Sequence, residues 1–282
     1  MDDAALILEG GGMRGVYTAG VLDFFLENSL KFPACYGVSA GACHASSYLS
    51  GQRGRALAVC TDYLDDKRYC SYRSLLKTGD LFGAEMLYDI IPNQLNLYDY
   101  EAFRQNPCRF FAVLTDCETG RAVYWPVKDM RRDIIAVRAS SSLPIISRMV
   151  EIEGRKYLDG GIADSIPLAR AMADGHRKNV VVLTQHPTYR KGPNHFTGLA
   201  KLKYRRYPAL VQAVADRHIH YNEALELVAA ETEAGRAFIL QPQKPVTISR
   251  TEHDADKLRE LYQEGYRDAK RNYDDLQAFL AD

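Results

Sequence analysis

The sequence predicts an α/β protein in which helices cover a mostly parallel sheet. Over about the first two hundred residues, short apolar runs that fit buried strands alternate with amphipathic helical patterns. Turn residues separate these segments, as βαβ units require. The sequence contains no internal repeat, low-complexity segment or linker. We therefore expect one domain over residues 1–282, with a motif-bearing core at about 6–184 and a helical part at 196–282.

The expected elements follow one another along the chain. Apolar residues at helical spacing predict the helix 13–27, and a segment rich in small residues predicts a closely packed helix at 40–50. Turns at Glu118-Thr119-Gly120 and Glu153-Gly154 predict two hairpins, with Gly120 at a positive φ. In full, we expect strands at 4–8, 34–38, 109–114, 121–125, 149–152, 156–158, 179–184 and 237–240, and helices at 13–27, 40–50, 54–64, 166–173, 208–233 and from 252 onward.

Composition and charge exclude several classes of protein. Hydrophobic residues make up 46% of the chain and charged residues 26%, which excludes disorder, collagen and coiled coil. The 36 basic residues balance the 36 acidic ones, so no global positive field attracts nucleic acid. Met1-Asp2-Asp3 does not begin a secretory signal, and no apolar run approaches the roughly 20 residues of a membrane span. We expect a soluble, cytoplasmic protein whose six cysteines are reduced and bind no metal.

The first segment that can carry chemistry is Gly10-Gly11-Gly12-Met13-Arg14-Gly15, between a predicted strand and a predicted helix. Successive glycines allow a sharp turn that aims backbone N–H groups at an anion. The segment also matches the dinucleotide-binding pattern G-x-G-x-x-G, which requires an acidic residue about 20 positions later. Residues 30–36 contain no carboxylate. We therefore favour an anion-binding loop over a nucleotide-binding oxidoreductase or a purely structural turn.

The second segment is Gly37-Val38-Ser39-Ala40-Gly41, at the end of the second predicted strand. This is the G-x-S-x-G elbow, in which a strained turn from strand to helix exposes a nucleophilic serine. Small residues on both sides are needed because strand and helix nearly touch. The alternative is a serine that only caps a tightly packed helix.

The third segment is Tyr157-Leu158-Asp159-Gly160-Gly161, where a carboxylate follows a strand and two glycines open the next loop. Taken alone, Asp159 is compatible with an ordinary turn. Asp159 becomes a candidate catalytic residue only in combination with the two earlier segments, because three motifs in a fixed order are far more specific than one.

Together the three motifs resemble the patatin-like phospholipases. That family has a glycine-rich oxyanion loop, then a G-x-S-x-G elbow, then a D-G-G or D-G-A sequence, and all three occur here in that order. The stretches 139–144 (ASSSLP) and 165–168 (SIPL) also match. The resemblance covers Leu6 to Leu168 and continues weakly to Thr184, while the C-terminal third matches no motif.

The resemblance implies a three-layer α/β/α fold and a serine lipid acyl hydrolase of the phospholipase A, lysophospholipase or esterase type. It assigns Ser39 as nucleophile and Asp159 as base, with no histidine, and Gly11 and Gly12 as donors to the oxyanion. The reaction on a phospholipid or other fatty-acyl ester passes through an acyl-enzyme and needs no metal or organic cofactor.

Two other interpretations remain open. His186 directly follows the predicted strand 179–184, where a catalytic histidine could complete a Ser-His-Asp triad instead of a dyad. A non-catalytic lipid-binding module would keep the fold, although intact Ser39 and Asp159 argue against it.

Residues 187–207 form the one marked charge block of this neutral chain, with six basic residues and no acidic one. A solvated helix face and loop would explain it. The functional alternative is a patch that contacts anionic lipid at the inner surface of the membrane, with tyrosines at the interface. The residues concerned are Arg190, Lys191, Lys201, Lys203, Arg205 and Arg206, with Tyr189, Tyr204 and Tyr207.

Overall fold

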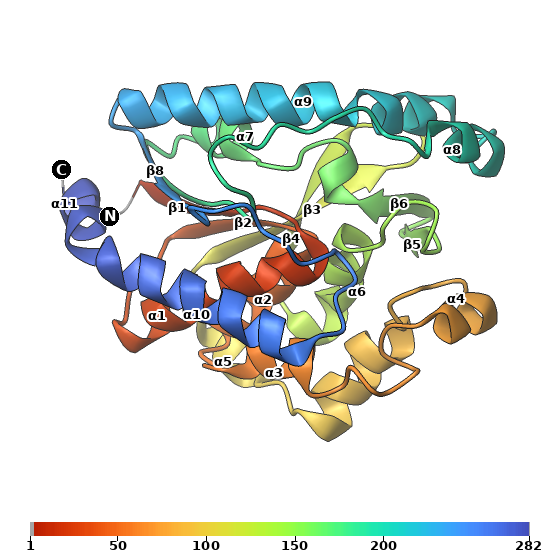
Figure 1. Cartoon of the computed structure of the whole chain (residues 1–282), viewed down its shortest axis with the longest axis horizontal. Helices are drawn as coiled ribbons and strands as arrows, with labels where there is room; N and C mark the ends of the chain where they lie inside the picture. Colours follow the sequence, from red (N-terminus) through yellow and green to blue (C-terminus); the bar gives the residue numbers. More distant parts are fainter. Residues whose placement is uncertain (1–2, 282) are drawn as a thin grey trace.

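An eight-stranded mixed sheet forms the middle layer of the protein (Figure 1). The computed structural model describes residues 3–281. The strands are β1 (Ala4–Leu8), β2 (Ala34–Val38), β3 (Arg109–Asp116), β4 (Ala122–Val127), β5 (Val150–Ile152), β6 (Arg155–Asp159), β7 (Lys178–Val182) and β8 (Ala237–Leu240). Their order is β5-β6-β3-β2-β1-β7-β8, and β4 pairs with β3. The strands from β3 to β8 in this order run parallel, whereas β3 pairs antiparallel with β4 and β6, and so does β5 with β6.

Helices lie on both sides of the sheet, and this confirms the predicted α/β class and its three layers (Figure 1). The helical segments are η1 (Gly12–Gly15), α1 (Val16–Glu27), α2 (Ala40–Leu49), α3 (Arg55–Thr61), α4 (Tyr72–Thr78), η2 (Met86–Leu95), α5 (Tyr100–Gln105), α6 (Met130–Ser140), η3 (Gly160–Ile162), α7 (Leu168–Ala173), α8 (Thr197–Lys203), α9 (Pro208–Glu233), α10 (Ala255–Arg271) and α11 (Tyr273–Ala281). Among them η1 and η3 are 3₁₀ turns and η2 is a π-helix.

Alternation along the strands divides the core between the two faces. In β1, Leu6 and Leu8 pack in the core under α1, α2 and α10, while Ala5 and Ile7 pack in the core under α7 and α9. Side chains of a strand point to opposite faces in turn, so a fully apolar strand serves both cores. This is why the short apolar runs of the sequence correctly predict buried parallel strands.

The helix boundaries differ from the predictions in several places. The glycine-rich loop leads into the 3₁₀ turn η1, so the α-helix begins at Val16 instead of Met13. The predicted helix 54–64 is the shorter α3. The predicted final helix breaks at Asn272 into α10 and α11, and it begins after Asp254, whose side chain accepts hydrogen bonds from the next turn. Between α3 and β3, the sequence patterns missed α4, η2 and α5.

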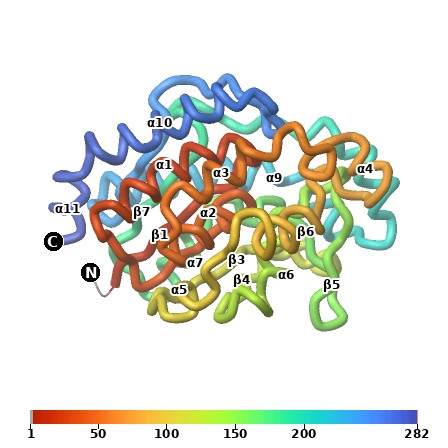
Figure 2. The backbone as a smooth tube through the Cα atoms, turned by 90° about the horizontal axis from the view of Figure 1, so that it is seen from below, coloured from red at the N-terminus to blue at the C-terminus, as the bar shows by residue number. Residues whose placement is uncertain are grey.

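Helix α10, near the C-terminus, runs along α1 on the same side of the sheet (Figures 1 and 2). Glycines permit this approach because a Cβ at Gly20 would collide with Tyr262 O, and one at Gly265 would collide with Tyr17 O. Within residues 3–281, no helix has both the length and the apolar character needed to cross a bilayer. The single-domain assignment stays a prediction, and its residues 1, 2 and 282 lie outside the described chain.

Candidate active site

Ser39 occupies a strained turn between β2 and α2. Its φ of 55° lies in the left-handed region, which residues with a side chain rarely adopt. A Cβ at Gly41 would lie 2.5 Å from Leu8 O, and one at Gly37 would lie 2.7 Å from the Cα of Ala42. The elbow therefore requires glycine on both sides of Ser39, as the sequence analysis expected.

The register of the sheet brings Asp159 to the level of Ser39. Val38, the residue before Ser39, pairs with Val113 of β3. The next residue of β3, Leu114, pairs with Asp159 at the end of β6. Two residues separated by 120 positions in the sequence thus meet across a single intervening strand.

A serine-rich stretch at the end of α6 holds both residues in place. Ser140 Oγ accepts a hydrogen bond from Ser39 N at 2.9 Å and donates one to Val113 O at 2.7 Å. Two residues later, Ser142 O accepts from Asp159 N at 2.8 Å. These bonds give a structural reason for the ASSSLP stretch noted in the sequence, because they join the elbow to β3 and β6.

Asp159 is a buried carboxylate whose side chain is only partly hydrogen-bonded. Its Oδ1 accepts from Gly161 N at 2.8 Å, whereas Oδ2 accepts no hydrogen bond of ordinary geometry from residues 3–281. Burial raises the pKa of Asp159 above its usual range; the charge of Arg217 and the nearby Ser39 hydroxyl oppose this only in part. A higher pKa makes the carboxylate a stronger base, and the free Oδ2 can accept a proton.

A small cavity lies between Ser39, Asp159 and the glycine-rich loop. About 20 Å³ of it accepts the centre of a water-sized sphere, which is enough for one water molecule. Gly10, Gly11 and Gly12 line this cavity. The N–H groups of Gly10 and Gly11 donate to no group among residues 3–281. An oxyanion hole would need such free backbone donors beside the nucleophile.

The other predicted members of the loops have different positions. Arg14 lines the cavity, and its buried Nε has no hydrogen-bond partner among residues 3–281. Gly15 does not line it; a Cβ there would lie 2.7 Å from the Cβ of Ala40, so this glycine allows η1 to contact α2. Gly161 lines the cavity beside Asp159, whereas Gly160 packs against the backbone of Val113.

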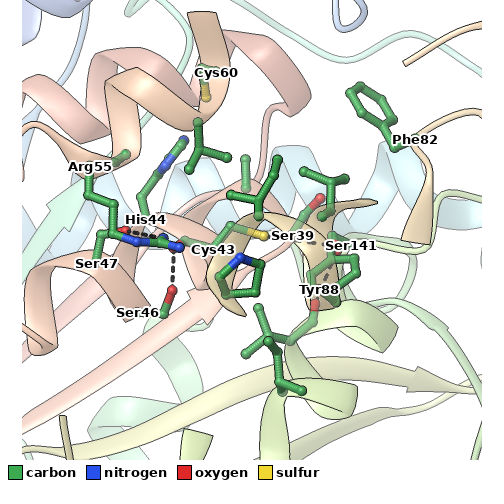
Figure 3. A pocket seen from close by; sticks show the side chains of 18 of the residues that line it. Ser39, Cys43, His44, Ser46, Ser47, Arg55, Cys60, Phe82, Tyr88 and Ser141 are labelled. Carbon is green, nitrogen blue, oxygen red and sulfur yellow. Dashed lines mark hydrogen bonds between the residues drawn. The ribbon is translucent and has the colours of Figure 1, made fainter. Parts of the chain in front are cut away.

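A larger, mainly apolar pocket of about 140 Å³ opens on another side of Ser39 (Figure 3). Ser39, Gly12 and Leu143 line both this pocket and the small cavity, so the two spaces adjoin at the nucleophile. The wall includes residues of α2, α3, α6 and the π-helix η2. Of these helices, η2 was among those that the sequence patterns missed. The aliphatic, methionine and phenylalanine side chains of the pocket are Met13, Ala40, Ala56, Val59, Phe82, Leu87, Ile91, Pro92, Met130, Ile134, Val137 and Leu143.

Charged and polar side chains that sequence reasoning did not assign to the site surround the small cavity. Glu9 accepts hydrogen bonds from Tyr221 Oη at 2.8 Å and from Thr184 N at 2.6 Å, which fixes its carboxylate. The cations Lys191, Arg217 and Arg250 line the same cavity. They come from a loop, from α9 and from the segment before α10, and no motif in the sequence marks them.

The histidine that the sequence offered for a triad lies elsewhere. His186 does not line the cavity of Ser39 and Asp159; its Nδ1 lies 2.9 Å from Thr188 Oγ1. Gln185 occupies the cavity wall at the end of β7 instead. His44 of α2 lines the apolar pocket, and burial lowers its pKa to about 4, so its imidazole is neutral at neutral pH.

The basic segment 187–207 is divided between the interior and the surface. Tyr204 is buried, and its Oη accepts from Ile145 N at 2.8 Å, so the prediction of an interfacial Tyr204 is wrong. Lys191 packs its amine 4.2 Å from the ring centre of Tyr221. The apolar side chains that are exposed in and beside α8 are Phe196, Leu199 and Leu202.

The fold is of the α/β class, and the elbow, the glycine loop and the buried aspartate meet in one candidate site around Ser39. The sequence model of the patatin-like phospholipases matches residues 6–172, which is more than half of the chain. The chain therefore belongs to the patatin-like phospholipase family, as the motifs predicted, and is thereby placed among lipid hydrolases. A second model, described only as a domain of unknown function, matches residues 207–281.

Comparison with curated proteins gives relatives of moderate similarity. The chain is 29% identical over 267 residues to the uncharacterized protein YjjU of Escherichia coli, covering 93% of this chain and 74% of that protein. It is 26% identical over 172 residues to an uncharacterized NTE family protein of Mycobacterium bovis, of which it spans 44%. It is 23% identical over 210 residues to the probable lipid hydrolase 463L of Invertebrate iridescent virus 6, covering 66% of this chain and 71% of that protein.

Proposed function

We propose that this protein is a serine lipid acyl hydrolase that cleaves fatty-acyl esters with Ser39 as nucleophile and Asp159 as base. The observation that carries the proposal is the placement of both residues on one small cavity that adjoins an apolar pocket. An ester held at Ser39 then has room for its acyl chain among apolar side chains. Such burial contributes about 0.8 kcal/mol for each methylene group.

In the first half of the reaction, Asp159 Oδ2 takes the proton of the Ser39 hydroxyl as Oγ attacks the carbonyl carbon. The carbonyl oxygen becomes an oxyanion, which accepts hydrogen bonds from the N–H groups of the glycine loop; Gly11 and Gly12 are the proposed donors. The tetrahedral intermediate collapses, the bond to the alcohol oxygen breaks, and Asp159 returns the proton to that oxygen. The acyl group remains esterified to Ser39.

In the second half, water replaces the alcohol. Asp159 removes a proton from the water as its oxygen attacks the acyl carbon, and the proton then returns to Ser39 Oγ as the fatty acid leaves. No group changes its oxidation state. The raised pKa of Asp159 supports this role, because its carboxylate must accept a proton twice in each cycle.

The first test is Ser39→Ala. We expect hydrolysis of a short-chain ester to fall by at least about a thousandfold, since the variant lacks the nucleophile and changes little volume. A fluorophosphonate probe should label the wild type, and mass spectrometry should place the label at Ser39. Ser249→Ala, at an exposed serine outside both cavities, is the control and should keep full activity. Full activity of the Ser39 variant would refute the proposal.

We also propose that the protein works at the surface of an anionic membrane, from the cytoplasmic side. Two helices at one end of the molecule support this (Figure 1). In α4, Tyr72 and Leu76 are 81% and 88% exposed; in α8, Leu202 is 71% exposed, between Lys201 and Lys203. Apolar side chains beside basic ones suit an interface of acyl chains and anionic headgroups.

A further inference from the structure

The small cavity at Ser39 carries more positive than negative charge. Four cations line it, Arg14, Lys191, Arg217 and Arg250, against two carboxylates, Glu9 and Asp159. Within residues 3–281, none of the four cations forms an ion pair within 4.0 Å. Four cations that share two carboxylates repel one another, and partial burial strengthens the repulsion. A further anion would therefore stabilise the arrangement.

The protonation of these groups agrees with this description. Burial, together with the charges of Arg217 and Arg250, lowers the pKa of Lys191 to about 7. Burial and the charge of Arg250 also lower the pKa of Arg14 and of Arg217. A bound anion would stabilise the charged form of all of them.

Three of the cations also line a second space, a cleft of about 500 Å³. Lys191, Arg217 and Arg250 stand on both the cleft and the small cavity. The lining of the cleft, all within residues 3–281, contains no carboxylate. An anion in this cleft thus meets cations and no acidic side chain.

The small cavity adjoins both of the other spaces, and Leu143 lines all three. The apolar pocket meets the small cavity at Ser39, and the small cavity meets the cationic cleft at Lys191, Arg217 and Arg250. A lipid ester has the same order of chemistry when its carbonyl is at Ser39: the acyl chain on one side and the alcohol part on the other. The alcohol part is then directed to the cations.

We propose that Arg14, Lys191, Arg217 and Arg250 form a subsite for the phosphate of a phospholipid headgroup. The inference rests on the hydrolase function proposed above and adds the residues that would make this chain prefer a phosphate-bearing ester to a neutral one. Arginine suits this role because its planar guanidinium binds two phosphate oxygens together. Three of the four residues lie outside the segment matched by the family, so the subsite belongs to the C-terminal part of this chain.

The test uses two monodisperse substrates that differ only in the phosphate, 1-hexanoylglycerol 3-phosphate and 1-hexanoylglycerol. We expect the wild type to prefer the phosphate substrate in kcat/KM. Arg250→Gln and Lys191→Gln should each reduce that preference by at least about tenfold, the factor expected for loss of one charge-assisted hydrogen bond. Arg250→Lys should restore part of it. Arg259→Gln, at an exposed arginine of α10, is the matched control and should leave the preference unchanged.

The alternative is that the cations act only through Asp159. The charges of Arg217 and Arg250 oppose the rise in the pKa of Asp159 that burial causes. In that case the Arg250 and Lys191 variants change both substrates by the same factor and move the acid limb of the pH profile, which would overturn the inference. Equal hydrolysis of the two substrates by the wild type would overturn it as well.

Binding of inorganic phosphate to the Ser39→Ala protein, measured by calorimetry, is independent of turnover. We expect binding that Arg250→Gln weakens by at least about tenfold. A protein that hydrolyses both esters but does not bind phosphate would overturn this inference alone. A protein that binds phosphate at these residues but hydrolyses neither ester would overturn the proposed function and with it the headgroup assignment, leaving a site for free phosphate.

Discussion

The part of the chain that carries the motifs and the C-terminal part supply the site in different ways. The first supplies backbone: the N–H groups of the glycine loop, the strained turn at Ser39 and the register that brings Asp159 beside it. The second supplies charged side chains at the ends of loops and helices, such as Arg217 and Arg250. Changes in the first part should therefore affect every ester, and changes in the second should affect only certain substrates or surfaces.

Space explains the difference between the two parts. Near the elbow, an added methyl group collides with backbone atoms, as at Gly41 and Gly12. Around the cleft, long side chains reach the cavity from segments far apart in sequence. Their charged end groups can be replaced by substitution without moving the backbone. We therefore expect backbone geometry to set the reaction and side chains to set the selectivity.

The largest effect should come from Asp159→Asn. We expect hydrolysis of neutral and phosphate-bearing esters to fall alike, by at least about a thousandfold, because the amide cannot accept the Ser39 proton. Asp65→Asn, at an exposed aspartate of the α3–α4 loop, is the control. His186→Ala should keep most of the activity, since His186 does not line the cavity. A dead His186 variant and an active Asp159 variant would replace the dyad by a triad.

The pH dependence should show the same base. Burial raises the pKa of Asp159, and only its ionised form accepts a proton. Activity is therefore lost as the pH falls through a value above the usual ~3.9 of aspartate, and His186→Ala leaves this limb unchanged. We would measure kcat/KM for a neutral short-chain ester, whose own charge does not change with pH. An acid limb that disappears in His186→Ala would indicate an imidazole base.

Gly12→Ala should have a smaller effect that reaches both parts of the site. A Cβ at Gly12, which has a φ of +59°, would lie 2.6 Å from Arg250 O, the acceptor of the Met13 N–H. We expect turnover to fall by at least about tenfold as the donor geometry is lost. The preference for phosphate should fall with it, because Arg250 must move.

The control for this substitution is Gly51→Ala. Gly51 has a similar φ of +70°, but no atom lies within 4 Å of an added Cβ. Backbone strain is then the same without any contact at the site, so stability should decrease while turnover is kept. Unchanged turnover in Gly12→Ala would remove Gly12 from the proposed oxyanion hole.

The sequence could predict what depends on local backbone requirements. Strands appear as apolar runs, and Gly120 has the expected positive φ of 66° at the hairpin between β3 and β4. Ser39 and Asp159 could be placed at strand ends because glycine is needed beside each. These features are visible because each is encoded within a few consecutive residues.

The sequence could not predict what depends on distant segments. The π-helix η2 contains Pro92, which argues against a continuous helix at this point of the sequence, yet it forms part of the apolar pocket. Lys191, Arg217 and Arg250 are ordinary cations in the sequence and meet only when the chain folds. Tyr204 occupies a basic segment that suggests the surface, but tertiary packing buries it. Composition alone does not distinguish an inward side chain from an outward one.

The smallest effect should come from the membrane surface, and it separates surface binding from substrate recognition. Replacing Lys201, Arg205 and Arg206 by Gln removes three exposed cations near α8. Lys203 is kept because its amine donates to Ile145 O at 2.8 Å. We expect binding to anionic vesicles to weaken by at least about fivefold, given up to about 1 kcal/mol for each cation near such a surface, with hydrolysis of a soluble ester unchanged.

A second variant tests the apolar part of the same surface. Leu202→Ser, at an exposed leucine between two lysines, should weaken vesicle binding without changing its salt dependence. The charge variant should instead flatten the salt dependence, because salt screens only the electrostatic part. Sedimentation with vesicles of phosphatidylglycerol and phosphatidylcholine at two salt concentrations measures both. Binding that neither variant changes would assign residues 187–207 to a solvated surface and limit the C-terminal part to the cleft beside Ser39.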